Sequence, residues 1–210
     1  MKYVFMMIVG LSLIFLFSCC ACAVRVDGPY KGKVIDADTR EPIEGVVVLG
    51  EWYRETPTAA GAVHRFYDAM ETVTDKNGDF EIKGLGLLVL SNVIPMDILI
   101  FKAGYEYIGI MPWRGLNSVG EKAEYEESYD PINKTKVLKT IYDNKRKVIW
   151  EGDKAIIPLR KLTMEERKSP PGPSSEAPFE KVRLMLKEMD RDDIERGLSS
   201  RKVWKGENIE

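Results

Sequence analysis

The amino-acid sequence predicts an all-β protein: a small β-sandwich with an inserted hairpin region and one amphipathic helix near the C-terminus. From Tyr30 to about Leu162, short runs of β-branched and aromatic residues alternate with Gly, Asn, Asp and Pro. No long helical period interrupts these runs, and an apolar stripe at helical spacing begins only after Pro178. Short strands at regular spacing, without helices between them, are typical of sandwiches and barrels.

The N-terminus has the layout of a secretory signal peptide. One lysine precedes the uncharged, mostly apolar run Tyr3–Phe17, and small residues and cysteines follow it. The junction Leu16–Cys19, with the sequence LFSC, resembles the lipobox of bacterial lipoproteins. In that family the signal is cut before the cysteine, which then carries the lipid. The resemblance implies a signal peptide over residues 1–18, lipid attachment at Cys19 and a lipidated tether over residues 19–29.

An ordinary secretory signal and an uncleaved N-terminal membrane helix are the alternatives. The apolar run has 15 residues, short of the roughly 20 that span a bilayer, although extending it to Val24 gives 22 uncharged residues. All three cysteines of the chain fall within residues 19–22, which favours a processing site. The lipoprotein resemblance implies a membrane-anchored protein of the bacterial cell envelope, facing the periplasm or the exterior, and an outer-membrane location in a Gram-negative host.

The predicted sandwich covers residues 30–162 and opens with two strands. Tyr30–Ala37 is the first, and a turn around Pro42 closes it. Gly45–Tyr53 is the second, and its almost continuous apolar run is typical of a strand that is buried on both sides.

A small-residue loop at Thr56–Val63 and a third strand at Arg65–Thr74 are expected next. The turn Asp75–Gly78 contains an Asn-Gly pair, which tolerates the positive φ of tight hairpins, so we expect a hairpin into the strand Asp79–Lys83. Three more strands complete the predicted sandwich: Asp97–Lys102, Tyr105–Ile110 and the closing strand Ala155–Leu162.

An insertion is predicted at about residues 111–153. Residues 117–130 hold five acidic side chains and one lysine, whereas residues 131–150 hold six basic side chains and one aspartate. Opposite charges on adjoining segments favour folding back, with Val137–Tyr142 paired to Val148–Trp150. A mobile polar excursion is the alternative.

The C-terminal part is predicted as a Pro-rich linker (residues 163–177), an amphipathic helix (178–198) and a tail (199–210). One apolar stripe follows the helical period: Phe179, Val182, Leu186 and Met189. An isolated helix of this length is marginal in water, so the stripe either docks on the sandwich, which we expect, or contacts a partner.

Three sequence blocks resemble carboxypeptidase regulatory-like domains. Gly32–Val48 is similar to their opening, Glu71–Phe80 to their second block and Phe101–Tyr105 to their third, in the expected order. The resemblance implies a transthyretin-like, Ig-like β-sandwich. It also implies a non-catalytic accessory or interaction module on an exported protein, and some relatives of this fold bind carbohydrate.

Charge and composition argue against several other classes of protein. The chain has 31 basic and 33 acidic residues, without the concentrated basic field of nucleic-acid binders. Its one histidine, His64, stands at a loop end without a nucleophile motif, so a hydrolase is the least favoured function. We therefore expect no catalytic residue, no metal site and no cofactor. The membrane, through the N-terminal lipid, and an envelope protein or a glycan are the expected partners.

Three aromatic residues are candidate contacts for a ligand or a partner. Trp52 and Tyr53 are neighbours on one strand and point to opposite faces, so one is expected in the core and the other exposed. Trp113 either packs under its own insertion, which we favour, or stands exposed in a loop. Exposed, it could form a sugar platform with Trp52 or Tyr53, so a carbohydrate-binding domain is the alternative function.

Overall fold

The structure is a computed structural model. It describes residues 24–59, 61–118, 124–130, 135–141, 147–168 and 175–198. The predicted signal peptide, Cys19, residues 169–174 of the predicted linker and the predicted tail lie outside the described residues.

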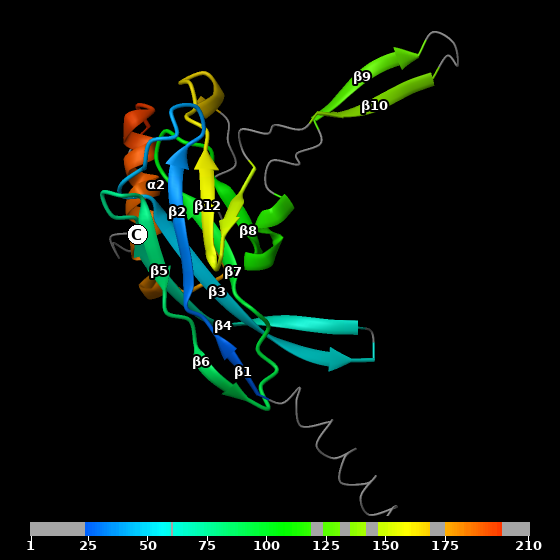
Figure 1. Cartoon of the computed structure of the whole chain (residues 1–210), viewed down its shortest axis with the longest axis vertical. Coiled ribbons are helices and arrows are strands. Elements are labelled where there is room, and N and C mark those ends of the chain that lie inside the picture. The colour runs from blue at the N-terminus through cyan, green and yellow to red at the C-terminus, as the bar shows by residue number, and fades with distance from the viewer. Residues whose placement is uncertain are drawn as a thin grey trace, which may run out of the picture.

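The described chain is mostly β-structure with one α-helix near its C-terminal end (Figure 1). The first six strands are β1 (Val24–Asp27), β2 (Tyr30–Asp36), β3 (Val47–Thr58), β4 (Gly61–Val73), β5 (Asp79–Ile82) and β6 (Gly86–Val89). The next six are β7 (Asp97–Phe101), β8 (Ile108–Pro112), β9 (Glu124–Asp130), β10 (Thr135–Ile141), β11 (Ile149–Glu151) and β12 (Lys154–Leu159). The helix is α2 (Arg183–Glu195), and short 3₁₀ turns cover Trp113–Ser118, Glu166–Lys168 and Phe179–Lys181.

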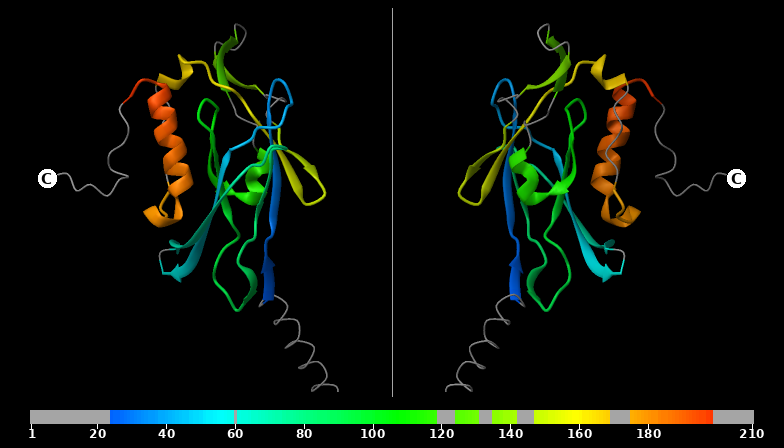
Figure 2. Two further views of the ribbon diagram at one scale, coloured as in Figure 1. Left: turned by 90° about the vertical axis from the view of Figure 1, so that its left-hand side faces the viewer. Right: turned by 90° about the vertical axis from the view of Figure 1, so that its right-hand side faces the viewer.

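Two four-stranded sheets form the body, with strand orders β11-β12-β2-β5 and β4-β3-β7-β8. They pack face to face, and α2 lies against the outer side of the second sheet, so Figure 2 shows three layers. Within these sheets β12 pairs with β2 in parallel, and the other strand pairs are antiparallel. The all-β prediction with a C-terminal helix is confirmed at this level.

The first part of β3, Val47–Tyr53, is buried on both faces, as its apolar run predicts. Alternate residues point to opposite sides of a strand. Val48 and Trp52 therefore join the core between the sheets, while Val47 and Leu49 join the cluster under α2.

The turn Asp75–Gly78 forms, but the hairpin predicted around it is wrong. The amide of Gly78 donates to the carbonyl of Asp75 at 2.8 Å, and Gly78 has φ +75°. A Cβ at this position would lie 2.4 Å from the carbonyl oxygen of Val34, so only glycine fits. However, β4 belongs to one sheet and β5 to the other. The turn carries the chain across the sandwich because β5 pairs with the distant strand β2 rather than with its neighbour.

A buried threonine ties this crossing to the earlier one around Pro42. The hydroxyl of Thr74 donates to the carbonyl of Ile43 at 2.6 Å and accepts the amide of Val46 at 2.9 Å. The amide of Val34 in turn donates to the carbonyl of Gly78 at 2.8 Å. The first two sequence blocks therefore meet at one end of the two-sheet body.

The loop predicted at Thr56–Val63 is wrong. Strands β3 and β4 stay paired up to Thr58 and Gly61, so the hairpin extends as an arm with a largely exposed far half. The pairing shifts register between Trp52 and Tyr53, where β4 carries one extra residue, Tyr67, in a β-bulge. Beyond the bulge, the backbones of β3 and β4 stay paired although few side chains in this part of the two strands are buried.

The region predicted as an insertion, residues 111–153, pairs differently from the prediction. Strand β9 from the acidic segment pairs with β10 from the basic segment, with Glu126 opposite Lys139. The expected pairing of Val137–Tyr142 with Val148–Trp150 is wrong, because β11 pairs with β12 instead. Both ends of the region belong to the body, since Trp113, Leu116 and Val148 are buried in the core between the sheets.

The tether predicted over residues 19–29 contains a strand that was not predicted from the sequence. Residues Val24–Asp27 form β1, which pairs with β6 in a separate two-stranded ribbon. This ribbon lies at one end of the molecule, at the bottom of Figure 1, and is called the β1–β6 ribbon below.

Candidate functional site

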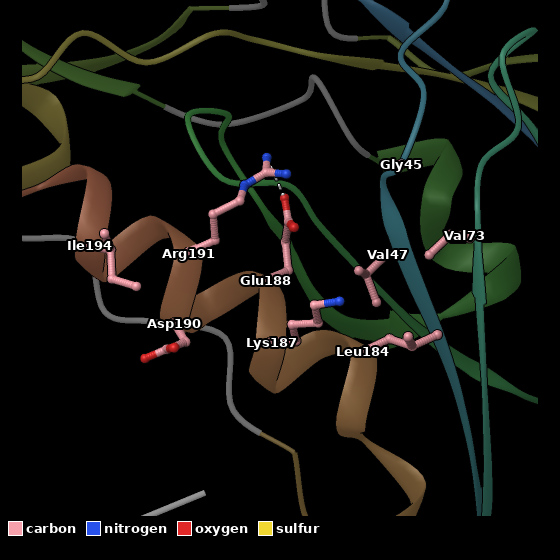
Figure 3. Close-up of a pocket in the computed structure, with 9 residues that line it drawn as sticks. All are labelled: Gly45, Val47, Val73, Leu184, Lys187, Glu188, Asp190, Arg191 and Ile194. Atoms are coloured by element: carbon pink, nitrogen blue, oxygen red, sulfur yellow. Dashed lines mark ion pairs between the residues drawn. The ribbon is translucent and has the colours of Figure 1, made fainter. Parts of the chain in front are cut away.

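A hollow beside α2 is the candidate recognition surface of the body (Figure 3). It has a volume of about 420 Å³ and lies between the helix and the end of the β3–β4 sheet. Its lining residues are Gly45, Val47, Val73, Leu184, Lys187, Glu188, Asp190, Arg191 and Ile194.

The hollow is lined by both apolar and charged side chains. Val73, Leu184 and Ile194 are 47%, 40% and 55% exposed, so apolar surface is open to solvent beside the helix. Between Leu184 and Ile194, the buried Glu188 lies 2.8 Å from Arg191, its ion-pair partner in Figure 3. Exposed apolar side chains beside charged ones suit contact with a side chain of another molecule.

The helix that forms one wall is held by its apolar stripe. Val182, Leu186 and Met189 are buried in one cluster with Leu49 and Phe101 of the sheet. The expectation that the stripe docks on the sandwich is confirmed, so these three residues are not a free partner surface. Phe179 differs from them, because it is 40% exposed.

A carboxylate from the sheet caps the start of α2. Glu71 of β4 accepts the amides of Leu184 and Met185 at 2.8 and 2.7 Å. These are amides of the first turn, which have no partner within the helix. Burial raises the pKa of Glu71 above its ordinary value, although the two amides act in the opposite direction.

Acidic side chains of α2 bind the turn that follows β7. Glu188 accepts the amide of Ala103 at 3.0 Å, and Asp192 accepts the amide of Gly104 at 3.2 Å. Lys102 lies 3.7 Å from Glu188, and burial lowers the pKa of Lys102 despite that carboxylate. The third sequence block is therefore fixed by the helix.

A buried arginine completes this charged contact. Arg167 lies 2.5 Å from Asp192 and 2.9 Å from Glu195, and its side chain is 8% exposed. Asp192 also pairs with Arg196 at 2.9 Å. Although both are charged, Glu188 and Asp192 are each only 8% exposed. Their spacing of four residues along the flank of the apolar stripe is the signal that could have indicated this role.

Trp52 and Tyr53 point to opposite faces, but both are buried, so the expectation that one is exposed is wrong. Trp52 is 0% and Tyr53 8% exposed. The indole of Trp52 donates to Asp27 at 2.7 Å. On the other face the hydroxyl of Tyr53 donates to the buried Glu51 at 2.6 Å, and burial together with that bond raises the pKa of Tyr53. The hydroxyl of Ser175, which precedes α2, donates to the same carboxylate.

Trp113 is 8% exposed and packs at the base of the insertion. Its ring lies edge-on to Trp150 and Tyr30, with centroids 5.4 and 5.5 Å apart. The packing that we favoured is confirmed. An exposed sugar platform of Trp113 with Trp52 or Tyr53 is therefore wrong, because all three side chains are covered.

His64 lies on the exposed β3–β4 arm. Its Nε2 is 3.2 Å from Oε2 of Glu55, and the two side chains are 51% and 46% exposed. This pair joins two neighbouring strands, since Glu55 and His64 are opposite each other in register. The described residues contain no group of three or more His, Cys, Asp or Glu side chains arranged to hold a metal ion.

Comparison of the chain with protein-family models, with curated proteins and with solved structures finds no match. Within the described part of the chain, no helix is both long enough and apolar enough to cross a bilayer.

Proposed function

We propose that this protein is a non-catalytic module of the bacterial cell envelope, anchored through a lipid on Cys19, that binds another protein or cell-wall material. The observation that carries the proposal is the LFSC junction at Leu16–Cys19. The first strand begins at Val24, so very little chain separates the proposed lipid from the body.

The arrangement of the body supports the finer proposal of a carboxypeptidase regulatory-like, transthyretin-like sandwich. The first block contains most of β2 and the crossing to β3, and the second contains the crossing from β4 to β5. Thr74 and Gly78 bond these two crossings to each other. The third block is the turn after β7 that α2 covers. Each block therefore lies where the chain reverses or changes sheet.

The surfaces of the body support binding rather than catalysis. The hollow beside α2 offers exposed apolar side chains together with charged ones, a mixture that suits a protein contact. His64 is held in a cross-strand pair on an exposed arm. We infer that the hollow takes an apolar side chain of an envelope partner.

Metabolic labelling with an alkyne fatty acid tests the anchor. Wild type and Cys20→Ala should carry the label, whereas Cys19→Ala should lose it, because only a cysteine at the cleavage junction is acylated. Cys20→Ala is the matched control, since it removes a thiol one residue away. Equal labelling of all three proteins would contradict the proposed lipid anchor on Cys19.

A photo-crosslinking amino acid tests the hollow in cells. Placed at Ile194, it should give an adduct with a protein or with cell-wall material, whereas the same group at Lys76 should not. Lys76 is an exposed turn residue outside the lining of the hollow. Identical adduct patterns at the two positions would remove the hollow from the proposal.

A further inference from the structure

The β1–β6 ribbon exposes an apolar face. Its register sets Val24 opposite Val89 and Val26 opposite Leu87, so these four side chains share one face of the ribbon. They are 51%, 58%, 71% and 65% exposed, in the order Val24, Val89, Val26 and Leu87. Leu90, directly after β6, is 83% exposed.

This pattern is the reverse of the usual one for a solvated strand pair, in which the outer face is polar. The inner face carries the polar residues: Arg25 donates to the carbonyl of Val93, and Asp27 is 3% exposed. In the part of the chain that the structure describes, nothing covers the outer face. A contiguous apolar patch of this kind marks a surface that meets another apolar phase.

The ribbon is fixed to the body, so its apolar face has a defined direction. The carboxylate of Asp27 accepts the indole N–H of Trp52 at 2.7 Å, the hydroxyl of Tyr30 at 2.7 Å and the amide of Leu85 at 3.1 Å. Leu88, on the inner face, packs against the core between the sheets. A Cβ at Gly84 would lie 2.3 Å from the carbonyl oxygen of Asp27, which shows how closely the segment before β6 approaches the end of β1.

The position of the ribbon in the chain indicates what covers this face. Val24 follows Cys19 by five residues, and five residues reach at most about 18 Å even when fully extended. A lipid on Cys19 therefore holds β1 close to the membrane surface. An uncleaved apolar segment at Tyr3–Phe17 would bring the same end of the body to the bilayer.

We propose that the outer face of the β1–β6 ribbon rests in the membrane interface. This inference rests on the proposed anchoring of the chain at its N-terminus. Val24, Val26, Leu87, Val89 and Leu90 then supply a second, non-covalent contact with lipid beside the acyl chains. Because Asp27 fixes the ribbon to the core, this contact sets the orientation of the whole body. The end that carries the turn Asp75–Gly78 is held away from the bilayer.

Fluorescence quenching in vesicles tests the proposal. The full chain, with Cys20→Ser and Cys22→Ser to remove competing thiols, is given Leu87→Cys and labelled with a nitrobenzoxadiazole probe. It is reconstituted in vesicles of phosphatidylethanolamine and phosphatidylglycerol, some of which carry nitroxide groups on the lipid. The matched control is Lys76→Cys in the same background, an exposed residue in the turn before β5.

The probe at Leu87 should lose emission to the lipid nitroxides and resist aqueous iodide, whereas the probe at Lys76 should show the opposite pattern. Iodide quenching at both positions would overturn the membrane contact. Protection of Leu87 from both quenchers would also overturn it, in favour of a second copy or a protein partner on this face. Vesicle flotation and the mass of the N-terminal peptide report the anchor separately, so a failed anchor is distinguished from a failed contact.

Discussion

The layer between the two sheets and the layer beneath α2 are both buried, but different side chains fill them. Between the sheets the contacts are apolar and aromatic, with Val48, Trp52 and Ile157 at or near 0% exposure. Beneath α2 an apolar stripe is flanked by buried charges, among them Glu188, Asp192 and Arg167.

The difference indicates a division of tasks between the two layers. Apolar contacts are non-directional, so the core between the sheets supplies stability with little geometric demand. The charged groups beneath α2 bind particular backbone amides, those of Ala103, Gly104 and the first turn of the helix. They fix the position of α2 and thereby the wall of the hollow.

The largest loss of stability is expected from a substitution in the core between the sheets. Trp52→Ala should lower the free energy of unfolding by about 3–5 kcal/mol, because it empties a buried indole site and removes a donor from Asp27. Chemical denaturation measures this loss. Trp52→Phe keeps most of the apolar volume and should lose less. An Ala variant as stable as wild type would mean that the sheets do not depend on this residue.

The apolar part of the helix layer should give the second largest effect. Leu186→Ala removes a side chain that is 6% exposed and should cost about 2–4 kcal/mol. Leu184→Ala is the matched control on the same helix; at 40% exposure it should stay within about 0.5 kcal/mol of wild type. Thermal and urea midpoints check both. Equal losses in the two variants would contradict the docking of the stripe, because Ala favours a helix at least as strongly as Leu and only Leu186 loses buried contacts.

A substitution among the buried charged groups beneath α2 should cause a smaller loss of stability. Asp192→Asn keeps the shape of the side chain but removes the charge that faces Arg167 and Arg196, and should cost about 1–3 kcal/mol. Lys187→Gln, at an exposed position of the same helix, is the control and should change stability little. Amide exchange at Gly104 should become faster in the Asp192 variant only. An unchanged exchange rate would mean that the turn does not need this carboxylate.

The smallest expected effect is a change of stability with pH that comes from Glu71. Burial raises the pKa of Glu71 above its ordinary 4.5, so the folded chain binds this proton more tightly than the unfolded chain. The stabilisation that comes from this tighter proton binding is complete below the ordinary pKa of 4.5. It is lost as the pH rises through the pKa of Glu71 in the folded chain. Relative to Glu71→Gln, wild type should therefore lose stability as the pH rises above 4.5.

Glu166 provides a comparison of opposite sign. The amide of Thr163, together with the ion pair to Arg160, lowers its pKa to about 2. Stability from Glu166 is therefore lost as the pH falls from 4.5 toward 2, and Glu166→Gln should remove that dependence. Denaturation curves across this range check both carboxylates. If stability changed with pH in the same direction for both carboxylates, the role assigned to burial at Glu71 would be contradicted.

Local patterns predicted much of the β-structure and the helix. The apolar run Gly45–Tyr53 indicated a strand buried on both faces, and the stripe at Val182, Leu186 and Met189 indicated a docked helix. Both predictions succeed because periodicity within one element shows which face must leave water. The Asn-Gly turn at Asp75–Gly78 was also predicted, since its backbone conformation depends on the residues in it.

Pairing between distant segments was not predictable in this way. Strand β1 pairs with β6 about 60 residues later, and nothing in Val24–Asp27 distinguishes a strand from a polar tether until that partner is present. The hairpin expected after β4 failed for the same reason. A turn sets the local bend of the chain, but the available partner decides which sheet the next strand joins.

The sequence by itself determined the all-β character, the apolar stripe of α2 and the turn at Gly78, because each depends on residue type and local spacing. The tertiary structure alone decided that Trp52, Tyr53 and Trp113 are all covered, and that the charged flank of α2 is buried. Exposure depends on what lies against a side chain, and here the covering groups come from segments distant in the chain. The apolar face of the β1–β6 ribbon is likewise a product of register, which brings two unremarkable short segments together on one side.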